Sequence, residues 1–158
     1  MSNITILSLD LGTTTGWAIY DDIGKITSGS VSFKDTPFDC KSSRYTKFRK
    51  FLNEKQKEHH IDQIIYEVVR RHMGTLAGQI YGGFMATLQT FGDDYEIEYL
   101  GFPVQTIKKF ITGKGNASKD EVIAAVKDKG HWPKDDNEAD AIALLCLRLD
   151  QYLRLDQE

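Results

Sequence analysis

Short runs of β-branched and aromatic residues, separated by turn-forming residues, fill the first part of the chain. This pattern predicts three consecutive antiparallel strands at residues 3–10, 15–21 and 25–33. Gly12 and Gly16 are predicted to make the tight turn between the first two strands. A meander of three strands is therefore expected to begin the fold.

From residue 34 onward the pattern changes. Residues 34–41 include Pro37 and other turn formers, which predicts a loop. Apolar residues then recur at helical spacing, and these helical segments alternate with strand-like runs. The predicted helices cover 42–59, 75–91, 103–111, 118–129 and 137–155, and the predicted strands cover 63–69 and 95–100. The alternation indicates an α/β fold with a mixed sheet covered by helices on both faces.

Helix starts are marked by small polar residues. Ser42 or Ser43 is suited to cap the first helix, and Ser118 to cap the fourth. The helix at 75–91 is rich in glycine and alanine, which lets another backbone approach closely. That surface suits either tight packing on the sheet or a subunit contact.

The length of 158 residues, with 41% hydrophobic and 27% charged residues, suits one core. One domain spanning 1–158 is therefore predicted. No secretory signal and no apolar run of membrane-spanning length is recognised. Cys40 and Cys146 lie far apart, without a pairing pattern or metal-ligand spacing. These features predict reduced thiols, a cytoplasmic location and no membrane partner.

A single carboxylate, Asp10, ends the first apolar strand immediately before a glycine turn. Such a position lies in the middle of the predicted sheet, where a charge is costly unless a cation compensates it. A metal ion is one such cation. The alternative is that Asp10 is an ordinary turn residue capped by nearby threonine hydroxyls.

Two further acidic sites favour the metal interpretation. Glu67 lies near the end of the strand at 63–69, and Asp140 shares a face of the last helix with Asn137 and Asp136. Carboxylates from distant segments could converge around hard cations such as Mg²⁺ or Mn²⁺. The alternative for the last cluster is helix capping by Asp and Asn, which the helix dipole favours.

The net charge of −3 and the pI of about 5.8 do not favour a nucleic-acid partner, but the charges are uneven. Basic residues gather in two stretches, at 41–57 and 108–119. A basic surface facing a phosphodiester is therefore compatible with the sequence. The alternative, an ordinary solvated helix face, is the better interpretation for the 41–57 stretch.

Four segments carry a resemblance to a known family. They are Asp10-Leu-Gly-Thr-Thr-Thr-Gly16, Glu67 at its strand end, Val104-Gln-Thr-Ile-Lys108-Lys-Phe-Ile-Thr-Gly113-Lys-Gly115-Asn-Ala-Ser-Lys119, and Asp136-Asn-Glu-Ala-Asp140-Ala. In this order they resemble the RuvC family of Holliday-junction resolvases over nearly the whole chain, and the short acidic chain is most similar to phage-type members. The resemblance implies an RNase H-like fold, in which a three-strand antiparallel meander and two parallel strands form a five-stranded sheet flanked by helices.

The resemblance also implies a function. It implies a homodimer that cuts one DNA strand at each of two active sites on a four-way junction, by two-metal-ion hydrolysis with Mg²⁺ or Mn²⁺. The helix at Gly78-Gln79 is where the family places its dimer contact. The implied metal ligands are Asp10, Glu67, Asn137 and Asp140, and Lys119 is an implied catalytic residue. The implied DNA-binding residues are Arg70, Arg71, Lys108, Lys109, Gly113, Lys114, Gly115, Asn116 and Lys119.

The chain departs from the family at two places. Asn137 replaces an aspartate, so either Asn137 supplies a neutral oxygen ligand or Asp136 takes over as fourth ligand. Arg70 and Arg71 stand where relatives carry an aromatic wedge, and they are suited to stack on bases or hold phosphates. The neighbouring His72 is interpreted as a lone surface histidine.

Three other functions fit part of the pattern. A branched-DNA-binding module with weak or no catalysis would explain Asn137. A related RNase H-like nuclease acting on replication forks or RNA would share the same carboxylates. An actin-like ATPase also begins with Asp-Leu-Gly-Thr-Thr, but it needs two such domains, for which 158 residues give no room. The sequence does not indicate whether a branch-migration motor is a partner.

Overall fold

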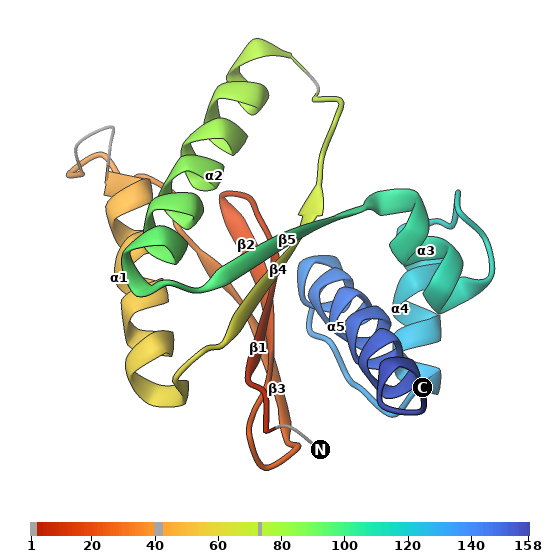
Figure 1. The fold of residues 1–158 in the computed structure, drawn as a ribbon. Coiled ribbons are helices and arrows are strands. Elements are labelled where there is room, and N and C mark those ends of the chain that lie inside the picture. Colours follow the sequence, from red (N-terminus) through yellow and green to blue (C-terminus); the bar gives the residue numbers. More distant parts are fainter. Residues whose placement is uncertain (1–2, 40–42, 73) are drawn as a thin grey trace.

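The computed structural model describes residues 3–39, 43–72 and 74–158, and within them one five-stranded sheet lies between two layers of helices (Figure 1). The strand order is β3-β2-β1-β4-β5. The β1–β2 and β2–β3 pairs are antiparallel, whereas the β1–β4 and β4–β5 pairs are parallel. The strands are β1 (Ile6–Asp10), β2 (Thr14–Tyr20), β3 (Ile26–Ser32), β4 (Gln63–Val68) and β5 (Glu98–Pro103). The predicted mixed sheet is thus confirmed, with β1 at its centre.

Figure 1 shows α1 and α2 on one side of the sheet and α3, α4 and α5 on the other. The helices are α1 (Ser43–His59), α2 (Thr75–Tyr95), α3 (Val104–Thr112), α4 (Lys119–Asp128) and α5 (Asp136–Leu155). Helices on both faces were predicted and are confirmed. None of the described helices is long and apolar enough to span a membrane.

The alternation of side chains assigns each strand position to one helical layer. In β1, Ile6 belongs to the core under α3, α4 and α5, whereas Leu7 and Leu9 belong to the core under α1 and α2. Ser8 and Asp10 share the face of Ile6, and the Ser8 hydroxyl donates to the Ala141 carbonyl of α5 at 2.7 Å. The last residue of the central strand therefore faces α5.

The predicted boundary between the second helix and the fifth strand is wrong by several residues. The helix runs on to Tyr95, and the strand begins at Glu98 rather than at 95. Glu96 has a left-handed backbone, with φ 55°, and the Ile97 amide donates to the Gly92 carbonyl at 2.8 Å. This left-handed cap ends the helix, and the sequence carries no glycine at Glu96 to signal it.

Glycines of α2 serve internal packing. A Cβ on Gly83 would lie 2.3 Å from the Tyr45 ring of α1, and one on Gly92 would lie 2.5 Å from the Tyr99 ring of β5. A Cβ on Gly82 would meet nothing within 4 Å. Two of the small residues therefore allow close packing within the chain, and Gly82 lies on an open part of the helix.

Predicted helix caps and cysteines have mixed outcomes. Ser118 caps α4 in a capping box with Glu121, as predicted. Ser43 begins α1 and donates to Asp35, whereas Ser42 and Cys40 lie outside the described residues. Cys146 is partly buried in α5, where burial raises the pKa of its thiol.

Gly16 was predicted to lie in the first turn, but it lies inside β2 opposite Asp10. The turn is closed instead by the Thr15 hydroxyl, which donates to the Gly12 carbonyl at 2.7 Å. A Cβ on Gly16 would lie 1.8 Å from the Asn137 carbonyl oxygen of α5. Gly16 therefore lets the first turn of α5 lie directly against β2.

Replacing Gly16 with alanine is expected to lower the free energy of unfolding by about 3 kcal/mol, because the new methyl group collides with backbone that cannot yield. Urea denaturation measures this loss. Gly12→Ala is the matched control, since its Cβ would lie 3.4 Å from the nearest atom, an ordinary contact. Equal stability of the two variants would contradict the close approach of α5.

Candidate metal centre

Three carboxylates meet at one edge of the sheet. Asp10 ends β1, Glu67 lies one residue before the end of β4, and Asp140 lies in the second turn of α5. Each offers an oxygen within 4.8 Å of the oxygens of the other two. The predicted convergence of remote carboxylates is confirmed, and the ligand roles of these residues stay a prediction. The three residues are called the acidic triad below.

Strand pairing explains why two of these side chains meet. β1 and β4 are parallel neighbours, and Leu9 pairs with Tyr66, so Asp10 and Glu67 follow at the same level. Parallel strands end at the same edge of a sheet. Ile65 packs in the same core as Ile6, so Glu67, two residues further on, shares the α5 face with Asp10.

The first turns of α5 bring in the third carboxylate. Asp135 is the N-cap, and its side chain accepts from the Glu138 amide at 2.8 Å. Capping was the alternative interpretation of this acidic cluster, and Asp135 does cap, while Asp140 joins the acidic triad. Glu138 points away from the triad, as its helical position predicts, and accepts a hydrogen bond from Ser28 of β3.

Burial, and after it nearby negative charges, raise the pKa values of the whole acidic triad. Burial, followed by the charges of Glu67 and Asp140, raises the pKa of Asp10 well above its ordinary value. Burial and Asp140 raise the pKa of Glu67 to about 7, although Lys108 opposes the rise. Burial and Asp136 raise the pKa of Asp140 to about 6, with Lys108 and Lys119 opposing. The triad lacks enough positive charge to keep all three groups ionised.

A hard divalent cation would supply the positive charge that the acidic triad lacks. The donor atoms are carboxylate oxygens, which Mg²⁺ and Mn²⁺ prefer, and their spacing lets one ion contact all three. A cation there would favour the ionised form of each group. The residues present thus fit the predicted metal.

Asp136 lies beside the acidic triad but is engaged elsewhere. Lys119 donates to Asp136 at 3.0 Å, which lowers the pKa of Asp136 and raises that of Lys119. The charge of Asp136 also raises the pKa of Asp140, so it lies near the triad. Asn137 is partly buried, and its backbone carbonyl packs on Gly16. Both candidates for a fourth ligand therefore border the site.

The predicted DNA-binding residues have different surroundings. Lys108 lies close enough to lower the pKa values of Glu67 and Asp140. Arg70 and Arg71 are exposed and line a cleft of about 760 Å³ next to Glu67. This cleft lies between the ends of β4 and β5 and is completed by Val68, Val69, Pro103, Val104, Gln105 and Thr106.

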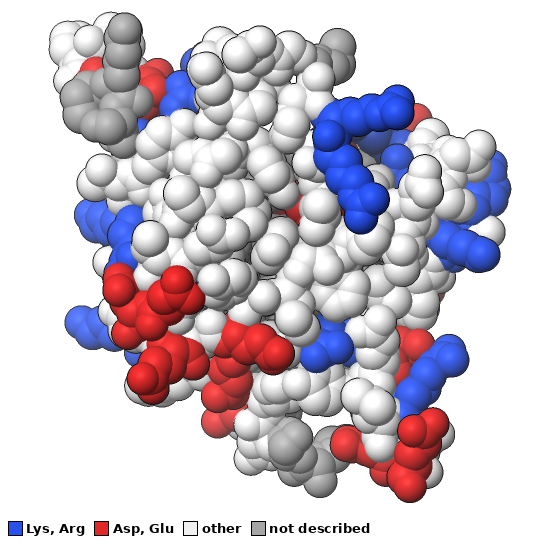
Figure 2. Space-filling model, turned by 45° about the horizontal axis from the view of Figure 1, so that its top comes forward, with Lys and Arg blue, Asp and Glu red and all other residues white. Residues whose placement is uncertain are grey.

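The loop after α3 is exposed. Gly113 has a φ of 86° and ends α3, Lys114 pairs with Glu121 at 2.8 Å, and Asn116 and Lys109 are exposed. Gly115 is partly buried. β4 runs toward the top of Figure 1, and this top comes forward in Figure 2. In Figure 2, Lys and Arg side chains gather at the upper right, and Asp and Glu side chains gather in the lower part of the view.

The basic stretch at 41–57 is partly neutralised by neighbouring acids. Ion pairs join Arg44 to Asp35, Lys47 to Asp39 and Arg49 to Asp94, at 2.6–2.8 Å. Lys41 lies outside the described residues. The pairing supports the interpretation of this stretch as an ordinary helix face.

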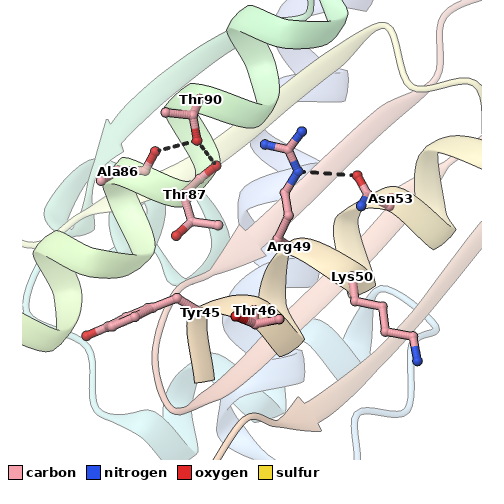
Figure 3. Close-up of a pocket in the computed structure, with 8 residues that line it drawn as sticks. All are labelled: Tyr45, Thr46, Arg49, Lys50, Asn53, Ala86, Thr87 and Thr90. Carbon is pink, nitrogen blue, oxygen red and sulfur yellow. Dashed lines mark hydrogen bonds between the residues drawn. The ribbon is translucent and has the colours of Figure 1, made fainter. Parts of the chain in front are cut away.

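Figure 3 shows a second hollow, of about 520 Å³, between α1 and α2. Its polar groups bond to one another: Arg49 donates to Asn53, and the Thr90 hydroxyl donates to the Ala86 and Thr87 carbonyls. No residue of the acidic triad lines it. This hollow therefore does not belong to the candidate metal centre.

Tyr81 of α2 supports the end of β4 at Glu67, a role that was not predicted. Its hydroxyl donates to the Glu67 carbonyl at 3.1 Å and accepts from the Val69 amide at 3.3 Å. The His72 ring lies 4.9 Å from the Tyr81 ring, so His72 is not the lone surface histidine that was expected. A tyrosine at this helical position cannot be distinguished from a core residue by spacing alone.

No protein-family profile and no curated protein sequence matches the chain. Solved structures do resemble it. RuvC of Thermus thermophilus in complex with Holliday junction substrate has a TM-score of 0.75 at 17% identity, over 89% of this chain and 90% of that one. The chain has the RuvC fold. The predicted RNase H-like architecture is thereby confirmed.

Two further resolvases share this fold. The yeast mitochondrial Holliday junction resolvase has a TM-score of 0.63 at 11% identity, over 90% of this chain and 76% of that one. Fowlpox virus resolvase with Holliday junction DNA has a TM-score of 0.55 at 12% identity, over 92% and 99%. None of the three comes from a phage, so the similarity to phage-type members of the RuvC family stays a prediction.

The acidic triad predicts how stability depends on pH in metal-free protein. Folding raises the pKa of Glu67 from 4.5 to about 7 and that of Asp140 from 3.8 to about 6. The native state therefore binds more protons than the unfolded state in this window, so stability falls as pH rises. The melting temperature in EDTA is expected to fall by about 5 °C between about pH 5 and about pH 7.5.

Glu67→Gln is the control for this profile, because an amide does not titrate and the slope should flatten. Excess Mg²⁺ is expected to restore the wild-type melting temperature at the upper end of the range. A melting temperature that rises with pH in EDTA would contradict the raised pKa values.

Proposed function

We propose that the protein is a metal-dependent endonuclease that resolves four-way and other branched DNA junctions. The observation that carries the proposal is the acidic triad, which unites the central strand, its parallel neighbour and α5 at one sheet edge. The fold supports it, because the resolvases of Thermus thermophilus and fowlpox virus were both solved with Holliday junction DNA.

The proposed metal site holds two Mg²⁺ or Mn²⁺ ions. Asp10, Glu67 and Asp140 would hold them, with Asn137 or Asp136 as the fourth ligand. When bound, such ions lower the pKa of a water molecule and stabilise the leaving oxygen of a phosphodiester. Asp10 would hold an ion together with either other member of the triad, because an oxygen of its carboxylate lies within 4.8 Å of an oxygen of each.

Lysines supply the positive charge that the phosphate needs. Lys108 already acts on Glu67 and Asp140, and Lys119 acts on Asp140 and Asp10. A scissile phosphate beside the triad would bring Lys119 a second acceptor in addition to Asp136. Charge that develops on the phosphate in the transition state is then neutralised by groups that are already in place.

The DNA path is proposed to follow the exposed basic groups around the triad. Arg70 and Arg71 at the mouth of the cleft are suited to stack on unpaired bases or to hold phosphates. Gly113 and Gly115 lack side chains and would let the backbone of this loop approach phosphate oxygens, although the Gly113 amide itself donates to the Lys109 carbonyl at 2.9 Å. The remaining members of this set are Lys108, Lys109, Lys114, Asn116 and Lys119.

A homodimer is part of the proposal, because a four-way junction is resolved by two symmetric cuts. The open part of α2 around Gly82 is the proposed contact, since its small residues allow a second chain to approach. Each protomer would then contribute one acidic triad.

A second candidate is a branched-DNA-binding module with weak or no catalysis. The observation that favours it is the pairing of Asp136 with Lys119, next to a neutral Asn137. With Asp136 paired and Asn137 neutral, the carboxylates left to bind metal are the three of the acidic triad. Cutting of replication forks or RNA by the same triad is a further outcome that substrate assays distinguish.

Purified protein with Mg²⁺ or Mn²⁺ is expected to nick a synthetic mobile four-way junction in symmetric strands and to leave linear duplex intact. Asp10→Asn should lower the nicking rate by more than about a hundredfold, because it removes a charged metal ligand. Its junction affinity should be kept, since one less negative charge faces the phosphates. Strand mapping on denaturing gels and gel-shift titration measure the two quantities.

Lys25→Ala serves as the control for this assay, because Lys25 lies in the exposed β2–β3 turn. Wild-type cutting by Asp10→Asn would contradict the site. Junction binding without cutting by the wild type in either metal would favour the binding module, and cutting of forks or RNA in preference to junctions would favour the related nuclease.

The identity of the fourth ligand is tested by comparing Asp136→Ala with Asn137→Ala. The variant that loses the ligand should need about tenfold more Mg²⁺ for half-maximal nicking. The other should shift this concentration by less than about twofold. We expect the larger effect from Asn137→Ala, because Asp136 is held by Lys119.

A further inference from the structure

A polar network beside the acidic triad holds the start of α5 on the edge strand β3. Resting on the proposed function, we propose that Glu138 is a positioning residue: its buried carboxylate, bonded to Ser28 of β3, fixes the first turn of α5 and thereby places Asp140 in the metal site. The Glu138 carboxylate bonds to Ser28 and to the Lys134 amide rather than to a member of the acidic triad, so it acts through the helix.

Glu138 is an unusual residue for its surroundings. Its side chain is 4% exposed, among the alanines and leucines of the α5 core. Its two hydrogen-bond partners are neutral: the Ser28 hydroxyl donates at 2.8 Å and the Lys134 amide at 2.8 Å. A buried carboxylate with neutral partners is a costly way to fill space, and an apolar side chain of similar volume would often stabilise the protein more. A role in geometry explains its presence better than a role in stability.

The serines of β3 are placed to receive this helix start. Ser28 and Ser30 are two residues apart and so point to the same face of the strand. Ser28 bonds to Glu138, and Ser30 donates to the N-cap Asp135 at 2.6 Å. Because Asp135 also accepts from the Glu138 amide, the two acids and the two serines form one connected network.

This network complements two contacts nearer the triad. The Ser8 hydroxyl of β1 binds the Ala141 carbonyl, and Gly16 of β2 allows the Asn137 carbonyl to lie against the sheet. The first two turns of α5 are thus held by three neighbouring strands, on both sides of Asp140 along the helix. A rotation or slide of α5 on the sheet would break several of these contacts together.

Small movements matter here because Mg²⁺ demands near-ideal octahedral geometry with short oxygen distances. Asp140 reaches the site from a helix, whereas Asp10 and Glu67 come from paired strands with a fixed register. The placement of α5 is therefore the adjustable part of the triad. β3, which contributes no carboxylate to it, helps to fix that placement.

The other end of α5 provides a matched control. Gln63 of β4 is 2% exposed, accepts from Arg148 of α5 at 2.8 Å and donates to Glu98 of β5 at 2.6 Å. Like Glu138, it is a buried polar side chain with two hydrogen bonds that joins α5 to the sheet. It lies at the first residue of β4, whereas the triad lies where β4 ends.

The experiment compares Glu138→Leu, Gln63→Leu and Glu138→Gln by calorimetric titration of the full chain with Mn²⁺. Glu138→Leu is expected to raise the Kd for Mn²⁺ about tenfold, as loss of a support for a metal ligand does. Gln63→Leu should change the Kd by less than about twofold. Thermal unfolding in EDTA measures the stability of each variant, and it should not rank them in the order of their Mn²⁺ affinities.

Glu138→Gln is expected to rescue binding. Its amide oxygen can accept from the Lys134 amide while its NH₂ group donates to the Ser28 hydroxyl. The double variant Ser28→Ala, Ser30→Ala keeps Glu138 but removes the hydrogen bonds that the two serines donate. It replaces Glu138→Leu in the experiment if that variant does not fold. This double variant should raise the Kd about threefold or more.

Wild-type Mn²⁺ affinity in Glu138→Leu, or in the double serine variant if the first does not fold, would overturn the positioning role and leave the metal centre intact. An equal loss of affinity in Gln63→Leu would overturn it as well, because the effect would then follow general loosening of α5. Failure of the wild type to bind Mn²⁺ would overturn the metal centre itself, and with it this role.

Discussion

The burial of three neighbouring carboxylates at the end of the central strand is the constraint on which the rest of the site depends. Asp10, Glu67 and Asp140 are brought together by the sheet and by α5, and their neighbours supply too little positive charge to balance them. Two of them have a pKa near neutrality. The packing around such a site keeps the three carboxylates close together. In the absence of a bound cation, their negative charges destabilise this arrangement.

That packing comes from both faces of the sheet. Alternate residues of β1 enter two separate hydrophobic cores, with Ile6 on one side and Leu7 and Leu9 on the other, all fully buried. Burial of this apolar surface on both sides anchors a strand whose last residue is charged. The polar contacts of α5 then determine the position of the third carboxylate, Asp140. Hydrophobic burial therefore holds the strands in place, and hydrogen bonds hold α5 at the distance from them that the site needs.

The local pattern of apolar and polar residues was enough to predict the features that repeat along the chain. Carboxylates at or near the ends of apolar strands, at Asp10 and Glu67, together with Asp140 on the last helix, were enough to predict their convergence around a hard cation. The extent of α2 and the start of β5 could not be predicted, because a glutamate in a left-handed conformation ends the helix. The role of Gly16 and the hydrogen bonds of Ser28 and Tyr81 depend on partners more than ten residues away, which periodicity does not reveal.

Asn137 gains a physical meaning in this setting. A fourth carboxylate at that position would add a negative charge to a triad that already resists ionisation, and under the proposed function a negative phosphate would approach the same place. A neutral amide lowers that repulsion while still offering an oxygen. Asp136, nearby, is balanced by Lys119 and adds little net charge. Under the proposed function, an asparagine here would therefore exchange attraction for a second cation against easier approach of the DNA backbone, and Lys108 and Lys119 would act in the same direction.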